Sequence, residues 1–152
     1  EVMGKLNGRF QIDFQSQQYF TMICGVLDTE TSLLRYVKAG HQPLIVQSPG
    51  GKVEVFKEGN GPVGWHSEVA FTQFELKLEK GTRLFLFSDG IVEARNKKLG
   101  QAFGYQNLVS LISSESKSTL DECIKAVSDG FRKWLDEDTP NDDITLLIIE
   151  IQ

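Results

Sequence analysis

The stretch Arg83-Leu84-Phe85-Leu86-Phe87-Ser88-Asp89-Gly90-Ile91-Val92-Glu93-Ala94 decides how the rest of the chain is interpreted. Its first half is an unbroken apolar run of large residues, which is typical of a strand buried on both faces. The run ends on Asp89 and Gly90, and a buried strand that delivers an aspartate to its end is a common way to place a functional carboxylate. The competing interpretation is an ordinary turn, since Asp-Gly is a frequent turn pair.

A second acidic stretch near the C-terminus has the opposite order. Asp142 and Asp143 come first, and an aliphatic strand over 144–151 follows them. If this strand is an antiparallel neighbour of the one over 83–87, Asp89 converges with Asp142 or Asp143. Carboxylates that cluster repel one another unless a cation lies between them. Oxygen ligands suit magnesium and manganese, so the pattern predicts a metal site, against the alternative of two unrelated polar strand ends.

Composition excludes several classes of protein. With 152 residues, 40% of them hydrophobic, the chain predicts one domain with a real core. The net charge of -5 gives no basic footprint for nucleic acid. No apolar run reaches membrane-spanning length and no signal peptide is visible. Cys24 and Cys123 have neither metal-binding spacing nor a disulfide framework, and we expect both in the core of a cytoplasmic protein.

The order of expected elements indicates an α+β fold with antiparallel sheets. The first residues have helix-compatible spacing, and a polar surface loop is expected over 94–104. Thr119 and Glu122 form a capping-box signature before a long amphipathic helix. The strand over 19–27 is nearly all apolar and predicts a central position. The remaining expectations are strands over 33–39, 44–47, 53–56, 74–78 and 83–87, helices over 105–113 and 120–135, and the last strand.

Several motifs stand in a fixed order from about Tyr19 onward. They are Phe20-Thr21-Met22, Leu27-Asp28, Tyr36-Val37-Lys38-Ala39-Gly40-His41-Gln42-Pro43, Gly61-Pro62-Val63-Gly64, Leu86-Phe87-Ser88-Asp89-Gly90-Ile91-Val92-Glu93-Ala94, Phe103-Gly104 and Asp142-Asp143-Ile144-Thr145. In this order and spacing they resemble bacterial PPM-type metal-dependent serine/threonine phosphatases. The branch concerned is related to stage II sporulation protein E and to the stress-response phosphatases of partner-switching pathways.

The resemblance implies a β-sandwich flanked by helices, with a binuclear Mn²⁺ or Mg²⁺ site. It implies that Asp89 and Asp142 are metal ligands and act in catalysis by holding the ions, whereas Asp143 is a supporting residue at the start of the strand. The implied reaction is attack of a metal-activated water on phosphoserine or phosphothreonine. The implied substrate is a phosphorylated regulatory protein, of the kind that antagonises an anti-sigma factor.

Two features depart from the family pattern. Lys38 stands where the family usually has Asn, where it either changes the local hydrogen bonds or lies at the rim. The family's first metal-binding motif is absent, and Asp13 has no turn of the expected kind around it. We therefore expect residues 1–152 to be the C-terminal portion of one phosphatase domain, without its N-terminal strands. On its own this portion is expected to bind metal weakly and turn over slowly or not at all.

Other interpretations remain open at this stage. The chain could be a non-catalytic interaction module of the same pathway. A haloacid dehalogenase-like phosphohydrolase needs a second Asp two residues after the first, where this chain has Ile91. His41 fits a structural turn better than a general acid. The basic run at 95–98 suits either a phosphoprotein or loop solubility. An open sheet edge predicts a possible homodimer, which sedimentation can test.

Overall fold

The structure is a computed structural model and describes residues 1–10, 19–67, 69–136 and 139–152. The chain divides into two compact units. Unit 1 comprises Glu1–Pro43 and Lys57–Leu78, and unit 2 comprises Leu44–Phe56 and Glu79–Gln152. Both acidic stretches that the sequence singles out belong to unit 2. In the part of the chain that the structure describes, no helix is long and apolar enough to cross a membrane.

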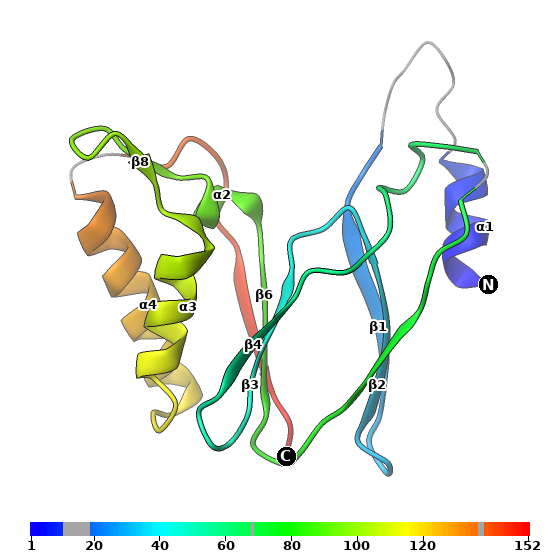
Figure 1. Cartoon of the computed structure of the whole chain (residues 1–152), viewed down its shortest axis with the longest axis horizontal. Coiled ribbons are helices and arrows are strands. Elements are labelled where there is room, and N and C mark those ends of the chain that lie inside the picture. The colour runs from blue at the N-terminus through cyan, green and yellow to red at the C-terminus, as the bar shows by residue number, and fades with distance from the viewer. Residues whose placement is uncertain (11–18, 68, 137–138) are drawn as a thin grey trace. The chain divides into compact units, whose positions relative to one another are not determined.

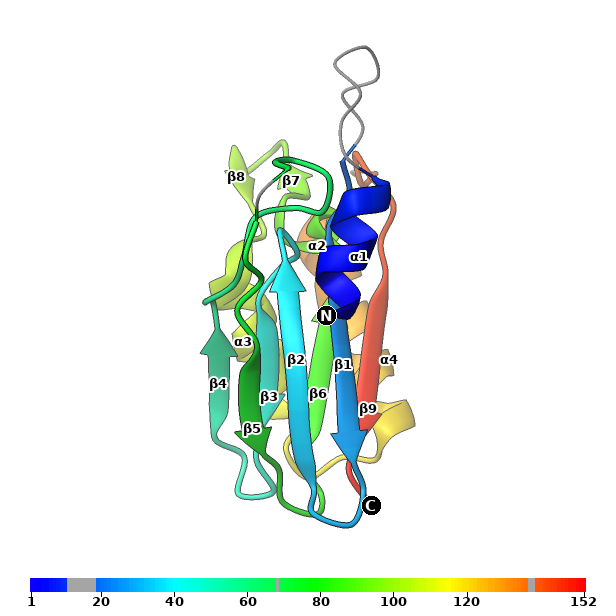
Figure 2. The ribbon, with the colours of Figure 1, turned by 90° about the vertical axis from the view of Figure 1, so that its right-hand side faces the viewer.

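Unit 1 is built on a three-stranded antiparallel sheet. β2 (Leu33–Ala39) lies between β1 (Met22–Asp28) and β5 (Phe74–Lys77), as Figure 2 shows. Helix α1 (Val2–Arg9) contributes Met3 to its small core. The predicted central position of the first strand is wrong, because β1 lies at the edge of this sheet and Val26 is 71% exposed. Apolar content shows that a strand tolerates burial, but it does not determine which neighbours the strand has.

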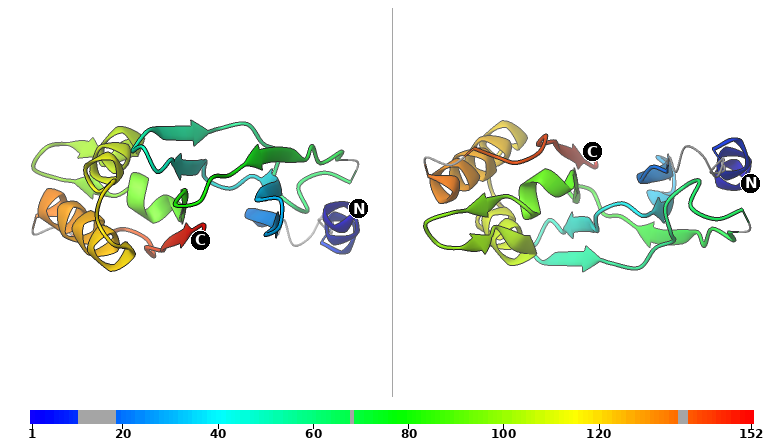
Figure 3. Two further views of the ribbon diagram at one scale, coloured as in Figure 1. Left: turned by 90° about the horizontal axis from the view of Figure 1, so that it is seen from below. Right: turned by 90° about the horizontal axis from the view of Figure 1, so that it is seen from above.

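Unit 2 contains a four-stranded antiparallel sheet with the order β4-β3-β6-β9. The strands are β3 (Leu44–Gln47), β4 (Val53–Phe56), β6 (Arg83–Phe87) and β9 (Leu146–Glu150). Helices α3 (Gly104–Ser114) and α4 (Leu120–Leu135) lie beside each other over one face of this sheet (Figures 1 and 3). The short helix α2 (Asp89–Val92) follows β6 directly. These elements confirm the predicted α+β class with antiparallel sheets.

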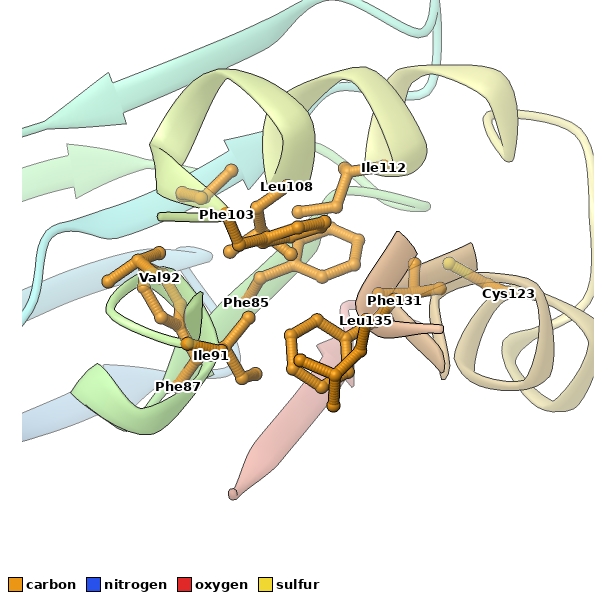
Figure 4. Close-up of a cluster of buried hydrophobic side chains, with 13 residues drawn as sticks. Phe85, Phe87, Ile91, Val92, Phe103, Leu108, Ile112, Cys123, Phe131 and Leu135 are labelled. Atoms are coloured by element: carbon orange, nitrogen blue, oxygen red, sulfur yellow. The ribbon is translucent and has the colours of Figure 1, made fainter. Parts of the chain in front are cut away.

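The core of unit 2 lies between the sheet and the two helices (Figure 4). Phe85 and Phe87 on one face of β6 are almost completely buried, and Leu84 on the opposite face is only 5% exposed, so the predicted burial of this strand on both faces is confirmed. Phe103 packs edge-on against Phe131 and Trp134, with ring centroids 5.1 Å apart in both pairs. Burying each large apolar side chain contributes about 1.5–3 kcal/mol, so this cluster is the main source of the unit's stability.

Helix α4 has the start and the face that its sequence predicts. Thr119 accepts a hydrogen bond from the Glu122 backbone N–H at 3.3 Å, and the Glu122 carboxylate accepts from the Thr119 N–H at 2.8 Å. The buried side chains recur every four residues and so form one stripe. They are Cys123, Val127, Phe131 and Leu135. The prediction that Cys123 is a core residue is therefore confirmed, and Cys24 of β1 is half-buried beside the core of unit 1.

The predicted surface loop over 94–104 is more ordered than its composition indicates. It contains a two-stranded hairpin, β7 (Arg95–Asn96) and β8 (Gln101–Ala102). Asn96 is only 4% exposed, and Ala94 and Phe103 are buried at the two ends of the segment. The predicted surface position is confirmed, because residues 97–102 are exposed, but the segment is a hairpin with a buried anchor and not an irregular loop. The homodimer through a sheet edge stays a prediction. Within the described residues, β1, β5, β4 and β9 form the edges of the two larger sheets.

Candidate functional site

The two acidic stretches meet because β6 and β9 are antiparallel neighbours. The register pairs Arg83 with Glu150 and Phe87 with Leu146. Since β6 ends where β9 begins, the residues after Phe87 lie beside the residues before Leu146. The two acidic stretches were expected to converge if their strands were antiparallel neighbours. The pairing of β6 with β9 meets this condition for the backbone.

Ser88 joins the two segments beyond the last strand pair. Its backbone N–H donates to the Thr145 carbonyl at 3.0 Å. Its hydroxyl accepts from the Thr145 N–H at 2.9 Å and donates to the Asp143 carbonyl at 3.0 Å. These three bonds hold the start of α2 against the approach to β9. The sequence motif Ser-Asp-Gly does not predict that Ser88 joins the two segments, because a serine in this position resembles any turn or N-cap residue.

Gly90 allows the closest approach between the two segments. A Cβ at this buried position would lie 2.3 Å from the Asp143 carbonyl oxygen and 3.3 Å from the Asp142 carbonyl oxygen. Any larger residue would therefore overlap backbone atoms of the acidic pair. The glycine of the Asp-Gly motif is thus required by packing between segments that are more than fifty residues apart, and not by the turn alone.

The carboxylates at this site are open to solvent. Asp89 is the first residue of α2, and Asp142 and Asp143 precede β9; all three are exposed. The Asp142 carboxylate accepts a hydrogen bond from the Asp143 backbone N–H at 2.7 Å, which restricts its orientation. The structure therefore brings together the two segments that carry the predicted metal ligands and leaves the side chains accessible.

The donor set fits a hard cation, but only in part. Carboxylate and carbonyl oxygens are the ligands that Mg²⁺ and Mn²⁺ prefer. Among the described residues, however, no group of three or more His, Cys, Asp or Glu side chains could hold a metal ion. Asp13, the aspartate considered near the N-terminus, lies outside the described residues.

Tyr105 is a neighbour of the site that sequence reasoning missed. Its ring packs edge-on against Phe87, with centroids 6.3 Å apart. Burial, and then the carboxylates of Glu93 and Asp89, raise the pKa of the Tyr105 phenol. In the sequence, only the position of Tyr105 directly after the Phe103-Gly104 motif could have indicated that it lies near the site. No local pattern links the first turn of α3 to the end of β6.

Lys38 and His41, the two unassigned polar residues of unit 1, contact each other. Lys38 is 8% exposed, and its Nζ donates to the His41 carbonyl at 3.1 Å. Burial lowers the pKa of the Lys38 ammonium, and the nearby Glu58 carboxylate opposes this shift. Of the two expectations for Lys38, the structure supports a change in the local hydrogen bonds and not a place at an exposed rim.

Comparisons with known proteins agree on one family. The family model described as stage II sporulation protein E (SpoIIE) matches residues 1–152. The phosphoserine phosphatase RsbU of Bacillus subtilis is 28% identical over 153 residues, which cover 98% of this chain and 44% of RsbU. The chain spans less than half the length of the curated relatives that it matches.

Two solved structures share the fold. The SiaA-PP2C domain of Pseudomonas aeruginosa matches 99% of this chain and 60% of its own, with a TM-score of 0.84 and 19% identity. The phosphatase domain of the cell fate determinant SpoIIE from Bacillus subtilis, presoaked with Mn, matches 87% of this chain and 56% of its own. Its TM-score is 0.66 at 19% identity. Because the family model matches every residue and the PP2C fold recurs in these structures, the chain belongs to the stage II sporulation protein E (SpoIIE) family.

Proposed function

We propose that this chain is part of a metal-dependent protein phosphatase that removes phosphate from phosphoserine or phosphothreonine of a regulatory protein. The observation that supports the proposal best is the meeting of the β6 end with the approach to β9, because these two segments carry Asp89 and Asp142. In this proposal both aspartates are metal ligands. Asp143 supports them through its backbone, by donating to the Asp142 carboxylate and accepting from Ser88.

The chain's own residues contribute charge and position to this chemistry. A bound Mn²⁺ or Mg²⁺ would lower the pKa of a water molecule and neutralise charge on a phosphate group. Asp89 and Asp142 would hold the cation, and the contacts of Ser88 and Gly90 would keep the two aspartates at a fixed separation. Positioning and charge neutralisation are the main requirements of phosphoryl transfer, so little further covalent help from the protein is needed.

The substrate class follows from the relatives and is part of the proposal. RsbU is a phosphoserine phosphatase by name, and 98% of this chain aligns with part of it. We therefore place the substrate among phosphorylated regulatory proteins, of the kind that controls an anti-sigma factor. The exposed position of the carboxylates suits a protein substrate, because a phosphoserine on a large partner can reach only an open site.

A second candidate is a non-catalytic interaction module with the phosphatase fold. The observation that favours it is that no cluster of three metal-ligating side chains occurs within the described part of the chain. Two carboxylates neutralise a divalent cation but leave most of its six or so coordination positions to water, so affinity would be low. The two candidates differ in turnover and not in fold.

Manganese-dependent release of phosphate from a phosphoserine peptide tests the proposal on the 152-residue chain. We expect slow release that requires Mn²⁺, with activity lost in Asp89→Asn and in Asp142→Asn. Asp121→Asn is the matched control, because it removes an exposed carboxylate from the first turn of α4. Calorimetry should show Mn²⁺ affinity reduced about tenfold or more by either site variant and unchanged by the control. Release that ignores Mn²⁺ or survives both site variants would refute the proposal, whereas Mn²⁺ binding without any release would favour the interaction module.

A further inference from the structure

The β7–β8 hairpin is anchored by a buried side chain, that of Asn96. The Asn96 Nδ2 donates to the Trp134 carbonyl of α4 at 2.6 Å. The Asn96 Oδ1 accepts from the Leu99 N–H at 2.9 Å, and the Asn96 carbonyl accepts from the Gly100 N–H at 2.9 Å. Asn96 thus joins β7 to α4 and orders the tip of the hairpin. Because the tip is ordered in advance, a partner that binds it loses less conformational entropy.

The hairpin exposes basic side chains and one apolar side chain to solvent. Arg95, Lys97 and Lys98 are exposed, and Leu99 between Lys98 and Gly100 is 57% exposed. Lys98 also forms an ion pair with Asp136 at 2.5 Å, which fastens the hairpin to the end of α4. Three basic residues within four positions contrast with the chain's net charge of -5. The hairpin is therefore a local basic and apolar feature on an acidic protein.

The hairpin lies at the same end of unit 2 as the candidate site. Only two residues separate its first strand from α2, whose first residue is Asp89. The Phe103 N–H closes the hairpin by donating to the Ala94 carbonyl at 2.8 Å. Figures 1 and 2 show α2 and the hairpin at this end of the sheet, where the approach to β9 also lies. A protein that placed a phosphoserine at Asp89 and Asp142 would have part of its surface within reach of the hairpin.

We propose that the β7–β8 hairpin is a docking surface for the phosphoprotein substrate, and that it selects partners with acidic and apolar residues beside the phosphoserine. The proposal rests on the proposed function and names the substrate surface that the site would accept. Charge complementarity supports it. A phosphoserine carries about −1.5 to −2 charges at neutral pH, so a partner that presents one is strongly anionic around it. Arg95 and Lys97 supply the attraction that directs an anionic partner to this end of the molecule.

Fluorescence anisotropy with synthetic phosphoserine peptides tests the docking surface. The peptides differ only in flanking residues, which are acidic, neutral or basic, and they are titrated with the whole chain in Mn²⁺ at low ionic strength. We expect the acidic peptide to bind about tenfold more tightly than the basic one. The double variant Arg95→Glu with Lys97→Glu should reverse this order, which loss of structure alone would not do. Leu99→Ser should weaken binding of an acidic peptide with a leucine beside the phosphoserine by about fivefold.

A double variant elsewhere in unit 2 controls for net charge. Lys52→Glu with Lys117→Glu replaces two exposed lysines and changes the net charge by the same amount as the hairpin variant. This control should keep the wild-type order of peptide affinities. Equal affinities for all peptides, no binding of any, or an order unchanged by reversal at Arg95 and Lys97 would overturn the docking surface. The unphosphorylated acidic peptide separates the two proposals. If it binds the hairpin as well as its phosphorylated form, docking holds and the phosphatase site loses support. If phosphate strengthens binding whatever the flanks, the site holds and docking fails.

Discussion

Substituting Gly90 with alanine is the sharpest test of how the two acidic segments fit together. The new Cβ would lie 2.3 Å from the Asp143 carbonyl oxygen and 3.0 Å from the Asp143 carbonyl carbon. Both atoms belong to the backbone, so they cannot rotate away as the end of a side chain can. Reaching the 3.4 Å at which ordinary contact begins requires a movement of roughly 1 Å between α2 and the approach to β9.

Two opposing terms set the magnitude. Alanine favours a helix over glycine by about 1 kcal/mol, so without the contact Gly90→Ala would stabilise α2. Overpacking of a well-packed interior typically costs about 1–3 kcal/mol. Because the overlap is with backbone, we expect the second term to dominate and the free energy of unfolding to fall by about 1–2 kcal/mol. The separation of Asp89 and Asp142 would change as well, so Mn²⁺ affinity should fall in the same variant.

Urea unfolding followed by far-UV circular dichroism, together with calorimetric titration of Mn²⁺, measures both effects. Gly4→Ala in α1 is the matched control, because a Cβ there would meet no atom within 4 Å. The control should be neutral or stabilising by up to about 1 kcal/mol. If Gly90→Ala is as stable as the control and binds Mn²⁺ like the wild type, the proposed contact between the segments is wrong.

Two further perturbations test how unit 2 is held together. Arg83 is buried, pairs with Glu150 at 2.8 Å and donates to two carbonyls before α4. We expect Arg83→Leu to lower the free energy of unfolding, measured with urea, by about 3 kcal/mol. A loss below about 1 kcal/mol would contradict this. Hydrogen bonds from Thr119 lower the pKa of Glu122 below its usual 4.5, so their stabilisation is present above that pH and is lost as the pH falls through the folded-state value. The stability difference between wild type and Thr119→Ala should therefore shrink in thermal unfolding below about pH 4.5, and a constant difference would argue against the capping box as its source.

The elements and their order could be predicted from the sequence because each has a strong local signal. The alternation of Phe74 and Leu76 with polar residues, the apolar run of β6 and the stripe on α4 all depend on neighbours close in the chain. The family resemblance could likewise be identified from the order of the motifs, and the SpoIIE match confirms it.

The details that shape the site depend on contacts between distant residues, which a single sequence does not record. The partner of Asn96 is the Trp134 carbonyl, 38 positions away, so the hairpin looked like an ordinary polar loop. The Tyr105 ring of α3 packs against Phe87 of β6, 18 positions earlier in the chain. The edge position of β1 was missed for the same reason, because strand order follows from tertiary pairing and not from composition. The metal ligands Asp89 and Asp142 stay a prediction.

The packing of the core determines whether the two acidic segments meet in this way. Side chains of β9 alternate between Leu146 and Ile148, which pack against the core, and Leu147 and Ile149, which are 51% and 40% exposed. A slip of one residue against β6 would turn the core-facing pair to solvent and bring the exposed pair inward. The same slip would carry Asp142 along the strand by about 3.3 Å relative to Asp89, and it would remove the partners of Ser88. Side chains with no chemical role therefore fix the register on which the spacing of the carboxylates depends, and core substitutions at Leu146 or Ile148 should disturb metal binding together with stability.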